Sequence, residues 1–589
     1  MRLALSVAAL ALGAARLGAQ GGPPDSAQAA AAAARPAIRD SVKPPFPTAD
    51  GDVVAAHGRE WRWRGDQVFQ TGANSLAELL ETIPGVRVMR SGFLIAPHVV
   101  AWLGDPGRVR VFLDGVELDA IDPRAGRGQD IGAIPLWNLD DVRVEATPGE
   151  LRVHLQTWRV ERTTAATRVD VLTGDAETNI YRGYFARRFQ SGLGAQFGFQ
   201  QMGQAIRDRG GDGDGLSMFV RVGVARERWS IDAVGQRDGR TRNATLREDS
   251  PGSVPPFSGG LSSSYLRLAL GSPDRSRTWA QVIAAGLAYR EETPPTQLSG
   301  GFGTAPVDTV DTNAFRAQYT AAAGVRRGAA SASAAARYRR IAGEGVFSPS
   351  VRIRFEASRV AVRAFAERAG EDSTMHMDVW IQTHALGWLS LSAAASRRSP
   401  MDDHPDPAST ILRAEAQLRV RGAEFTAGIV SRDSARTPAL PVFARGISAS
   451  AASDASGLIY GLRIPVYKAL IADINGTRWE SVDLYRPKDE VRIRLGIDTE
   501  WRSRFPRGDF TVRASGTMVN YSQWLVPTDD GIVSLAGARV YSTLLEVRIK
   551  SATIAWEFRN PDGARYETVP GYQMPRLINL YGVRWRFTN

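Results

Sequence analysis

Residues that could carry out chemistry are few in this sequence of 589 residues. No nucleophile elbow, Walker loop or HExxH motif is present, and the absence of cysteine excludes thiol nucleophiles and thiolate metal ligands. The sequence therefore predicts no catalytic residues, no resident metal and no cofactor, and we expect the protein not to be an enzyme. The six histidines are His57, His98, His154, His376, His384 and His404.

Three segments nevertheless contain residue types that bind metals. Residues 375–378 (MHMD) and 401–406 (MDDHPD) lie near predicted loop tips and together offer thioether, imidazole and carboxylate ligands. Residues 210–215 (GGDGDG) have the acidic, glycine-rich character of calcium loops but lack the remaining ligand spacing. We interpret all three as ordinary polar loops.

The chain opens with an export signal. A basic start, an apolar run over residues 3–15 and small residues before Gln20 are typical of a secretory signal peptide, which we place at residues 1–19. A membrane anchor is the alternative, but the run is shorter than the ~20 residues needed to span a bilayer. Residues 20–59 begin with a tail rich in Ala, Pro and Gly, and we expect this segment to be disordered or extended.

The net charge of +11 does not point to nucleic acid. The basic residues are spread through the chain instead of being clustered on one segment. We interpret them as solvated surface and expect no nucleic-acid partner; a lumen or loop surface that attracts anions is the alternative.

A small α/β unit is predicted at residues 60–160. Ser75 with Glu78 three residues later predicts a capped helix, which Pro84 and Gly85 end. Short strand patterns follow, and together they give one small core. The strand segments are GVRVM, RVRVFLDGVEL with a turn at Asp114 and Gly115, LDDVRVEA after Ile134 and Pro135, and ELRVHLQTW.

From residue 161 to residue 589 apolar and polar residues alternate, as in VRIRFEA at residues 351–357. We count roughly 22 strands of about 10–15 residues, joined by tight turns that alternate with longer loops, which is the pattern of a membrane-spanning antiparallel barrel. Residues 443–453 are assigned to a loop, because a strand there would make the number odd. A soluble sandwich or propeller is the alternative, but its strands would be shorter.

A barrel of about 22 strands is too wide for its own side chains to fill. We therefore predict a mainly β fold in which the α/β unit at residues 60–160 plugs the lumen of a transmembrane barrel at residues 161–589. Inward arginines are expected to contact carboxylates of the plug, with simple hydration as the alternative. The arginines are Arg352, Arg354, Arg492, Arg494, Arg584 and Arg586, and the carboxylates include Asp114, Glu117, Asp119 and Asp122.

With these features the sequence resembles the TonB-dependent outer-membrane receptors. Three plug motifs of that family occur in the same order here, although the Gly-rich stretch that usually follows them is replaced by EATPGELRVHLQTW. The first motif matches at Ser75, Leu76, Glu78, Leu79, Leu80, Pro84, Gly85 and Val86. The second matches at Val111, Leu113, Asp114, Gly115 and Val116, and the third at Ile134, Pro135, Leu139, Val142, Val144 and Glu145.

The two ends of the chain carry further parts of the resemblance. Asp52, Val53, Val54 and Ala55 resemble the TonB box, an extended segment that pairs with the energising partner; a plain linker is the alternative. Tyr581, Trp585 and Phe587 resemble the closing strand that signals to the barrel-assembly machinery, with Phe587 two residues before the end.

The resemblance implies a monomer in the lipid of a bacterial outer membrane. Its implied function is the import of an unidentified solute, with a TonB-type energising protein and the barrel-assembly machinery as partners. A plugged barrel that acts as a structural or interaction protein without transport is the alternative.

Overall fold

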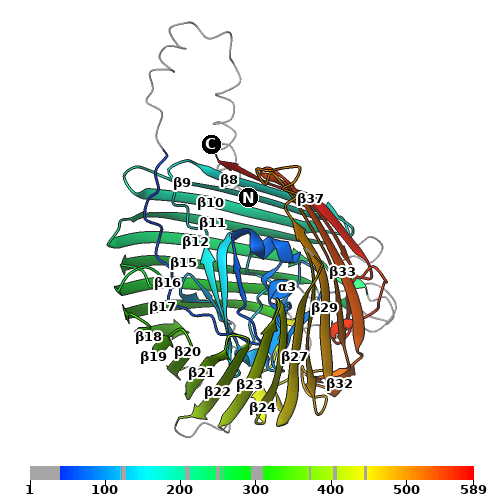
Figure 1. The fold of residues 1–589 in the computed structure, drawn as a ribbon. Coiled ribbons are helices and arrows are strands. Elements are labelled where there is room, and N and C mark those ends of the chain that lie inside the picture. Colours follow the sequence, from blue (N-terminus) through cyan, green and yellow to red (C-terminus); the bar gives the residue numbers. More distant parts are fainter. Residues whose placement is uncertain are drawn as a thin grey trace. The chain divides into compact units, whose positions relative to one another are not determined.

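Antiparallel strands between residues 166 and 588 pair in sequence order until the last strand meets the first (Figure 1). The computed structural model describes residues 40–588 except 120, 122–127, 206–211, 247–252, 255, 294–309, 342, 371–372, 402–407, 444–446 and 468. The predicted signal peptide lies outside the described residues. Lys43–Asn589 form one unit, separate from Met1–Val42.

Within the described residues the barrel has 22 strands, as the sequence predicts. The closed ladder leaves no edge strand, because β37 pairs with β8 over residues 580–588. The strands are β8 (Ala166–Gly174), β9 (Thr178–Arg188), β10 (Leu193–Gln204), β11 (Gly213–Ala225), β12 (Trp229–Arg242), β15 (Phe257–Leu270), β16 (Thr278–Thr293), β17 (Val310–Arg327), β18 (Ala330–Ile341), β19 (Glu344–Glu356), β20 (Val360–Ala369), β21 (Thr374–Leu386), β22 (Leu389–Pro400), β23 (Ser409–Val420), β24 (Ala423–Arg432), β27 (Ala455–Tyr467), β28 (Leu470–Trp479), β29 (Asp489–Thr499), β30 (Phe510–Tyr521), β33 (Ala538–Ile549), β34 (Ala552–Arg559) and β37 (Ile578–Thr588).

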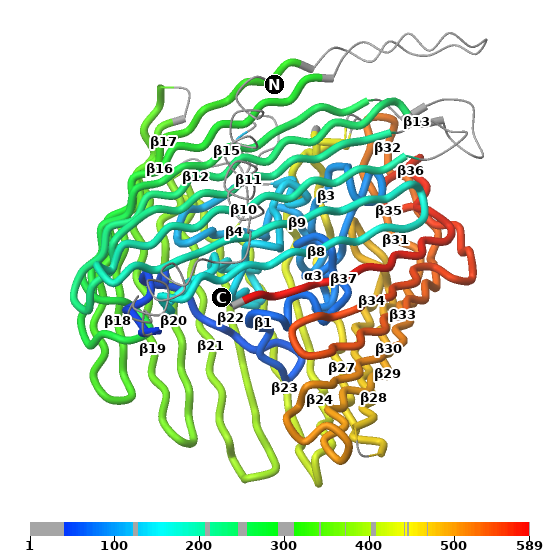
Figure 2. Tube along the Cα trace, turned by 90° about the horizontal axis from the view of Figure 1, so that it is seen from above, coloured from blue at the N-terminus to red at the C-terminus, as the bar shows by residue number. Residues whose placement is uncertain are grey.

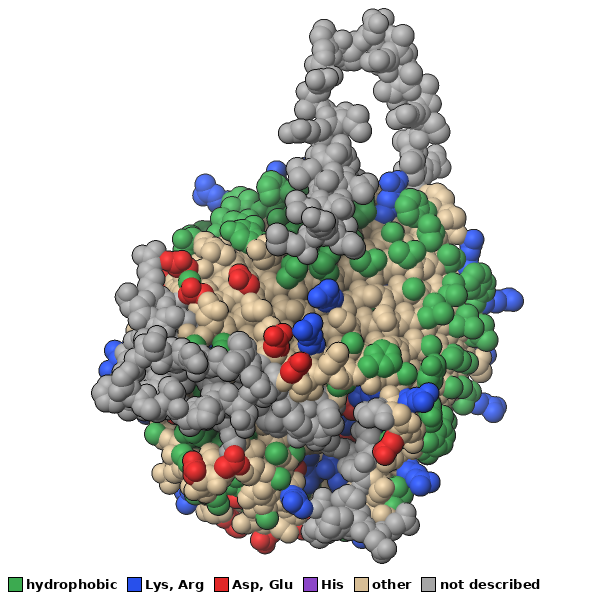
Figure 3. Space-filling view, turned by 180° about the vertical axis from the view of Figure 1, so that it is seen from behind, with side chains coloured by type: hydrophobic (Ala, Val, Ile, Leu, Met, Phe, Trp, Pro, Cys, Tyr) green, Lys and Arg blue, Asp and Glu red, His purple; other side chains and the backbone are tan. Residues whose placement is uncertain are grey.

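The outer surface of the barrel is apolar. On β15, Leu266, Leu268 and Leu270 point outward and are each more than half exposed, whereas the alternate residues Tyr265 and Arg267 are buried inside. Figure 3 shows hydrophobic side chains gathered on the right of the view. An apolar exterior around a polar interior is the signature of a barrel that spans an outer membrane.

No helix among the described residues is long and apolar enough to cross a membrane.

The connections between barrel strands largely follow the predicted alternation. One end has tight turns, such as the two residues 421–422 between β23 and β24, and the other has long connections, such as residues 433–454 between β24 and β27. The alternation is not strict, because β8 and β9 are joined by residues 175–177 and β18 and β19 by residues 342–343 on the long-loop side. The alternation of charged and apolar residues in a strand predicts which face is buried. It does not predict at which residue the strand ends, and so it does not predict the length of each connection.

A small mixed domain lies within the ring of barrel strands, where Figures 1 and 2 both show its elements in blue to cyan. Its sheet has the order β1-β6-β7-β4-β5, and β2 and β3 form a separate hairpin. We call residues 43–160 the N-terminal unit. Its elements are β1 (Arg62–Arg64), η1 (Gly65–Thr71), α3 (Leu76–Leu80), β2 (Val86–Arg90), β3 (His98–Trp102), η2 (Pro106–Arg108), β4 (Val109–Leu113), β5 (Val116–Glu117), β6 (Leu139–Ala146) and β7 (Leu151–Thr157).

Helix α3 forms for the predicted reason. The Ser75 hydroxyl accepts a hydrogen bond from the Glu78 N–H at 3.3 Å, and Gly85 ends the segment with φ +84°. Leu79 and Leu80 are fully buried in the core of the N-terminal unit. The Glu78 carboxylate accepts from the Asn74 N–H instead of closing a capping box on Ser75.

The expectation of disorder for residues 20–59 is wrong for residues 43–59. Val53 and Val54 are buried, and Val54 forms a parallel bridge beside β6. Small apolar side chains and acidic residues in this segment find partners on the inner wall, which composition alone could not show.

Four of the long connections fold over the β2–β3 hairpin. Their side chains form one hydrophobic cluster with those of the hairpin. Residue 443 and residues 447–453, the described part of the segment assigned to a loop, carry no barrel strand; Ser450–Ala452 pair in a small hairpin instead. The elements of the connections are β13 (Thr245–Leu246), β14 (Ser253–Val254), β25 (Ala435–Thr437), η3 (Pro441–Phe443), β26 (Ser450–Ala452), β31 (Trp524–Thr528), β32 (Gly531–Leu535), β35 (Glu567–Val569) and β36 (Tyr572–Gln573). The cluster includes Met89, Val99, Leu440, Phe443, Tyr485, Trp524, Val526, Val569 and Tyr572.

We expect the outer face of β15 to respond to charge according to depth. Leu266→Arg places a guanidinium within the lipid-facing band and should lower the free energy of unfolding by about 2–4 kcal/mol. Leu270→Arg is the matched control at the strand end and should cost about 0–1 kcal/mol. Urea unfolding of the protein in lipid vesicles measures both. Equal effects of the two substitutions would contradict the assignment of this face to lipid.

Candidate functional site

The N-terminal unit contacts the barrel wall through side chains. Among the described residues, no strand of the unit pairs with a barrel strand. Each barrel strand already pairs with two neighbours, so its backbone donors and acceptors are taken. The candidate functional site is therefore this charged interface between the unit and the wall, where any rearrangement must begin.

Asp114, in the turn between β4 and β5, connects the N-terminal unit to two barrel strands. Its carboxylate accepts hydrogen bonds from the Thr157 hydroxyl at 2.6 Å, from the Tyr265 hydroxyl at 2.8 Å and from Arg221 at 2.8 Å. Burial alone would raise the pKa of Asp114, but Arg221 and Arg267 hold that pKa below its usual value. The turn needs Asp-Gly because both residues have positive φ, +49° and +92°.

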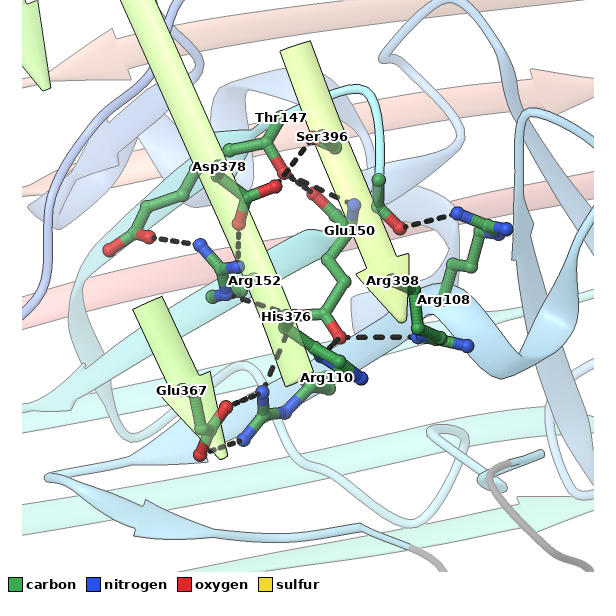
Figure 4. Close-up of polar contacts among 12 residues, drawn as sticks. Arg108, Arg110, Thr147, Glu150, Arg152, Glu367, His376, Asp378, Ser396 and Arg398 are labelled. Atoms are coloured by element: carbon green, nitrogen blue, oxygen red, sulfur yellow. Dashed lines mark hydrogen bonds and ion pairs between the residues drawn. The ribbon is translucent and has the colours of Figure 1, made fainter. Parts of the chain in front are cut away.

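Figure 4 shows a second cluster, in which β7 meets β20, β21 and β22. Glu150 lies 2.8 Å from His376 Nδ1, 3.0 Å from Arg152 Nε and 3.3 Å from one nitrogen of Arg398. Arg152 continues the cluster to Asp378 on β21. Charges of both signs alternate in this cluster, so Glu150, Arg152 and Asp378 each have an opposite partner.

Arg110 on β4 extends this cluster toward β20. It lies 2.6 Å from Glu117 of its own unit and also pairs with Glu367 of the wall, where the Nη2 to Oε1 distance is 3.2 Å. Arg337 joins the same two carboxylates from β18. These residues belong to no motif in the sequence. The signal that could have found them is charge at strand positions of a small core, which burial then requires to be paired.

Helix α3 is fastened to the last barrel strands. Arg559 holds both oxygens of Glu78, at 2.5 and 2.9 Å, and also contacts Glu557 at 2.7 Å. Burial would raise the pKa of Glu78, but the Arg559 charge and hydrogen bonds lower it to about 2. This bidentate pair fixes the helix end against β34.

Residues 43–66 form a belt along the inner wall. The belt meets the turn between β15 and β16 and then successive barrel strands through polar contacts: Thr48 with Ser272, Asp50 with Arg354, Asp52 with Arg354 and Arg363, Gly58 with Glu415, Arg59 with Asp473, and Asp66 with Arg586. Its start, at residues 44–47, lies beside residues 226–230 and 271–276 at the short-turn end of the barrel.

The TonB-box candidate sits in this belt. Asp52 forms ion pairs of 2.9 and 3.0 Å with Arg354 and Arg363. Val54 donates to the Val144 carbonyl at 3.2 Å and accepts from Ala146 at 3.3 Å, so its backbone is already used. In this state the backbone N–H and C=O of Val54 become available to another strand only after they leave β6.

Of the six predicted lumen arginines, four have polar contacts with the unit, but their partners differ from those named. Arg352 pairs with Glu145, Arg354 with Asp50 and Asp52, Arg492 with the Glu81 carbonyl and Arg586 with Asp66, whereas Arg584 contacts the barrel residues Asp170 and Glu546. Asp114, Glu117 and Asp119 pair with other wall arginines, among them Arg221, Arg337 and Arg316, and Asp122 lies outside the described residues. The sequence predicts that the arginines pair with carboxylates, but it does not predict the strand register, which decides which residues pair.

The remaining motif residues take structural positions. Ile134 and Pro135 are buried in the N-terminal unit. Tyr581 and Trp585 point outward on β37 and are each 47% exposed, and the Phe587 ring packs against that of Trp585 in a tilted arrangement with ring centroids 4.5 Å apart. These aromatic residues lie on the strand that closes the barrel.

The metal-binding candidates lie only partly within the described residues. Residues 375–378 lie within β21 instead of at a loop tip, and His376 contacts Glu150 and Thr374. Residues 402–407 and 206–211 lie outside the described residues. Among the residues that the structure describes, no group of three or more His, Asp or Glu is placed to hold a metal ion.

Comparison with known proteins identifies the architecture. No protein-family model and no curated protein match the sequence. The siderophore receptor PirA from Acinetobacter baumannii superposes with a TM-score of 0.66 at 10% identity, over 89% of this chain and 98% of PirA. A variant of the ferric enterobactin receptor PfeA from Pseudomonas aeruginosa gives 0.67 at 11% identity, over 89% and 98%. The FrpB iron transporter from Neisseria meningitidis gives 0.66 at 10% identity, over 89% and 99%.

These findings define an outer-membrane β-barrel with a folded unit inside its lumen. The chain has the fold of the TonB-dependent outer-membrane receptors, and the resemblance seen in its motifs is confirmed at the level of the fold.

We expect Glu78→Gln to loosen the N-terminal unit in a pH-dependent way. The folded-state pKa of about 2 lies below the usual 4.5, so the pair stabilises the unit above about pH 4.5 and this contribution is lost as pH falls toward 2. The loss at neutral pH should be on the order of 3 kcal/mol. The measurement is the urea concentration at which a protease first cleaves the unit.

The control is Glu60→Gln, which alters an exposed residue of the same unit. Wild type should approach the Glu78→Gln variant as the pH is lowered from 5 to 3. A constant difference between them over this range would show that the carboxylate does not act through its charge.

Proposed function

We propose that the protein is a receptor-type transporter of the outer membrane, in which the N-terminal unit plugs the barrel and rearranges to admit a solute. The observation that carries this proposal is the nature of the interface. A unit that lies in the lumen and shares no strand pairing with the wall, as far as the described residues show, can move by exchanging side-chain partners while the barrel stays closed.

The position of the belt supports energised opening. Its start lies at the short-turn end, which in outer-membrane barrels faces the periplasm. We propose Asp52 to Ala55 as the segment that a TonB-type protein engages after it leaves β6. A single parallel bridge holds Val54 there, and strand addition replaces such backbone bonds at low cost.

The transported solute is proposed only as a class. The neighbouring structures are named as siderophore, enterobactin and iron receptors or transporters, and an iron complex is the first substrate to test. Folding by the barrel-assembly machinery through Tyr581, Trp585 and Phe587, a monomeric state and the lack of enzymatic activity remain predictions.

A disulfide across the start of the belt tests the transport model. The Thr48 and Ser272 side-chain oxygens lie 3.4 Å apart, and the chain has no cysteine of its own. In Thr48→Cys/Ser272→Cys, force on the N-terminus would be borne by the barrel instead of the unit. We expect uptake to be lost on oxidation and regained on reduction. Uptake is measured as protein-dependent depletion of iron complexes and other solutes from the medium.

The two single-cysteine variants are the controls and should transport in both redox states. If no solute is depleted in a protein-dependent manner, or if the oxidised double variant transports as well as wild type, the transporter proposal is wrong and the structural alternative gains support.

A further inference from the structure

A cavity of about 170 Å³ lies between the N-terminal unit and the wall formed by β29, β30, β33 and β34. It extends from α3 to the connection that carries β35 and β36. Apart from the pair of Glu78 and Arg559, the side chains of this cavity have no part in the proposed transport. The polar lining residues that matter are Glu78, Glu81, Arg87, Arg90, Arg492 and Arg559.

Two of the four arginines are already neutralised by carboxylates. Arg90 pairs with Glu81 at 2.5 Å, and Arg559 pairs with Glu78 and Glu557. The positive charges of these two guanidinium groups are therefore already balanced by carboxylates of the protein.

Arg87 and Arg492 lack such pairs. Arg87 is only 5% exposed, yet its Nε and one Nη have no hydrogen-bond partner in the described part of the chain. Arg492 donates to the Glu81 carbonyl at 2.6 Å rather than to a carboxylate. Glu490 lies near both arginines, but no hydrogen bond or ion pair joins it to either of them. A buried guanidinium with open donors costs free energy unless an anion or water supplies acceptors.

The rest of the lining suits a flat ring. The Arg87 guanidinium lies 3.4 Å from the Tyr521 ring centroid and 5.0 Å from that of Trp524. Tyr521, Tyr566 and Phe93 line the cavity. A cavity of about 150 Å³ is large enough to hold benzene, so a single ring with one charged substituent matches the available space.

We propose that this cavity binds a small aromatic carboxylate, whose two oxygens accept hydrogen bonds from Arg87 and Arg492 while its ring packs on the tyrosines. A carboxylate fits because the guanidinium fork donates two parallel bonds to it. Binding here does not require transport, so it can be tested on the isolated protein.

Titration calorimetry with benzoate on the full chain in detergent tests the site. Wild type should bind benzoate saturably, and benzamide, which has the same shape without the charge, should bind about tenfold more weakly or worse. Arg87→Gln and Arg492→Gln should each weaken benzoate binding by a similar factor. Arg62→Gln removes an arginine that pairs with Asp141 outside the cavity, and it should leave binding unchanged.

Each variant is first shown to be folded by its heat-dependent migration in gels. Absence of saturable benzoate binding to folded wild type would overturn the proposal. Equal binding of benzamide, or unchanged benzoate binding in both folded variants Arg87→Gln and Arg492→Gln, would overturn it as well.

Discussion

Closure of the backbone ladder is the constraint on which the rest of the structure depends. Once β37 pairs with β8, each barrel strand has a partner on both sides, and only side chains remain for contacts with the lumen. Apolar side chains face outward, as Leu266 does, and polar ones face inward. Whatever occupies the lumen must therefore be held by the chemistry of these inward side chains, and among the buried polar residues of the described barrel strands arginine is the most frequent.

The N-terminal unit matches this wall by supplying both acidic and basic partners. Asp114 and Glu150 each reach the wall from a different strand or turn of the unit, and each is fully buried with arginine or histidine beside it. Such pairs contribute little net stability when intact, but breaking one partner leaves a costly buried charge. The interface is therefore specific, and its pairs can be exchanged one at a time, which suits the proposed movement of the unit during transport.

The sequence predicts the secondary-structure elements of the fold better than it predicts the contacts between them. The two-residue alternation of apolar and polar residues predicts the barrel and its number of strands. Ser75, Pro84 and Gly85 predict the helix. The belt was missed because residues 43–59 have a linker-like composition, and their order comes from wall residues hundreds of positions away, such as Arg354 and Glu415. The sequence did not predict the cluster around Glu150 for the same reason, because the strand register and the curvature of the barrel decide which residues of the wall face Glu150. The motif predicts the turn at Asp114 and Gly115, but the contacts of this turn with Arg221 and Tyr265 depend on how the unit sits in the barrel.

Conductance across planar lipid bilayers tests the central claim most directly, which is that the N-terminal unit occludes the pore without pairing its strands with those of the barrel. Barrels of the full chain should insert without steady conductance, and barrels lacking residues 43–160 should show large, stable channels. Equal conductance of the two forms, with both shown to be folded, would contradict the account.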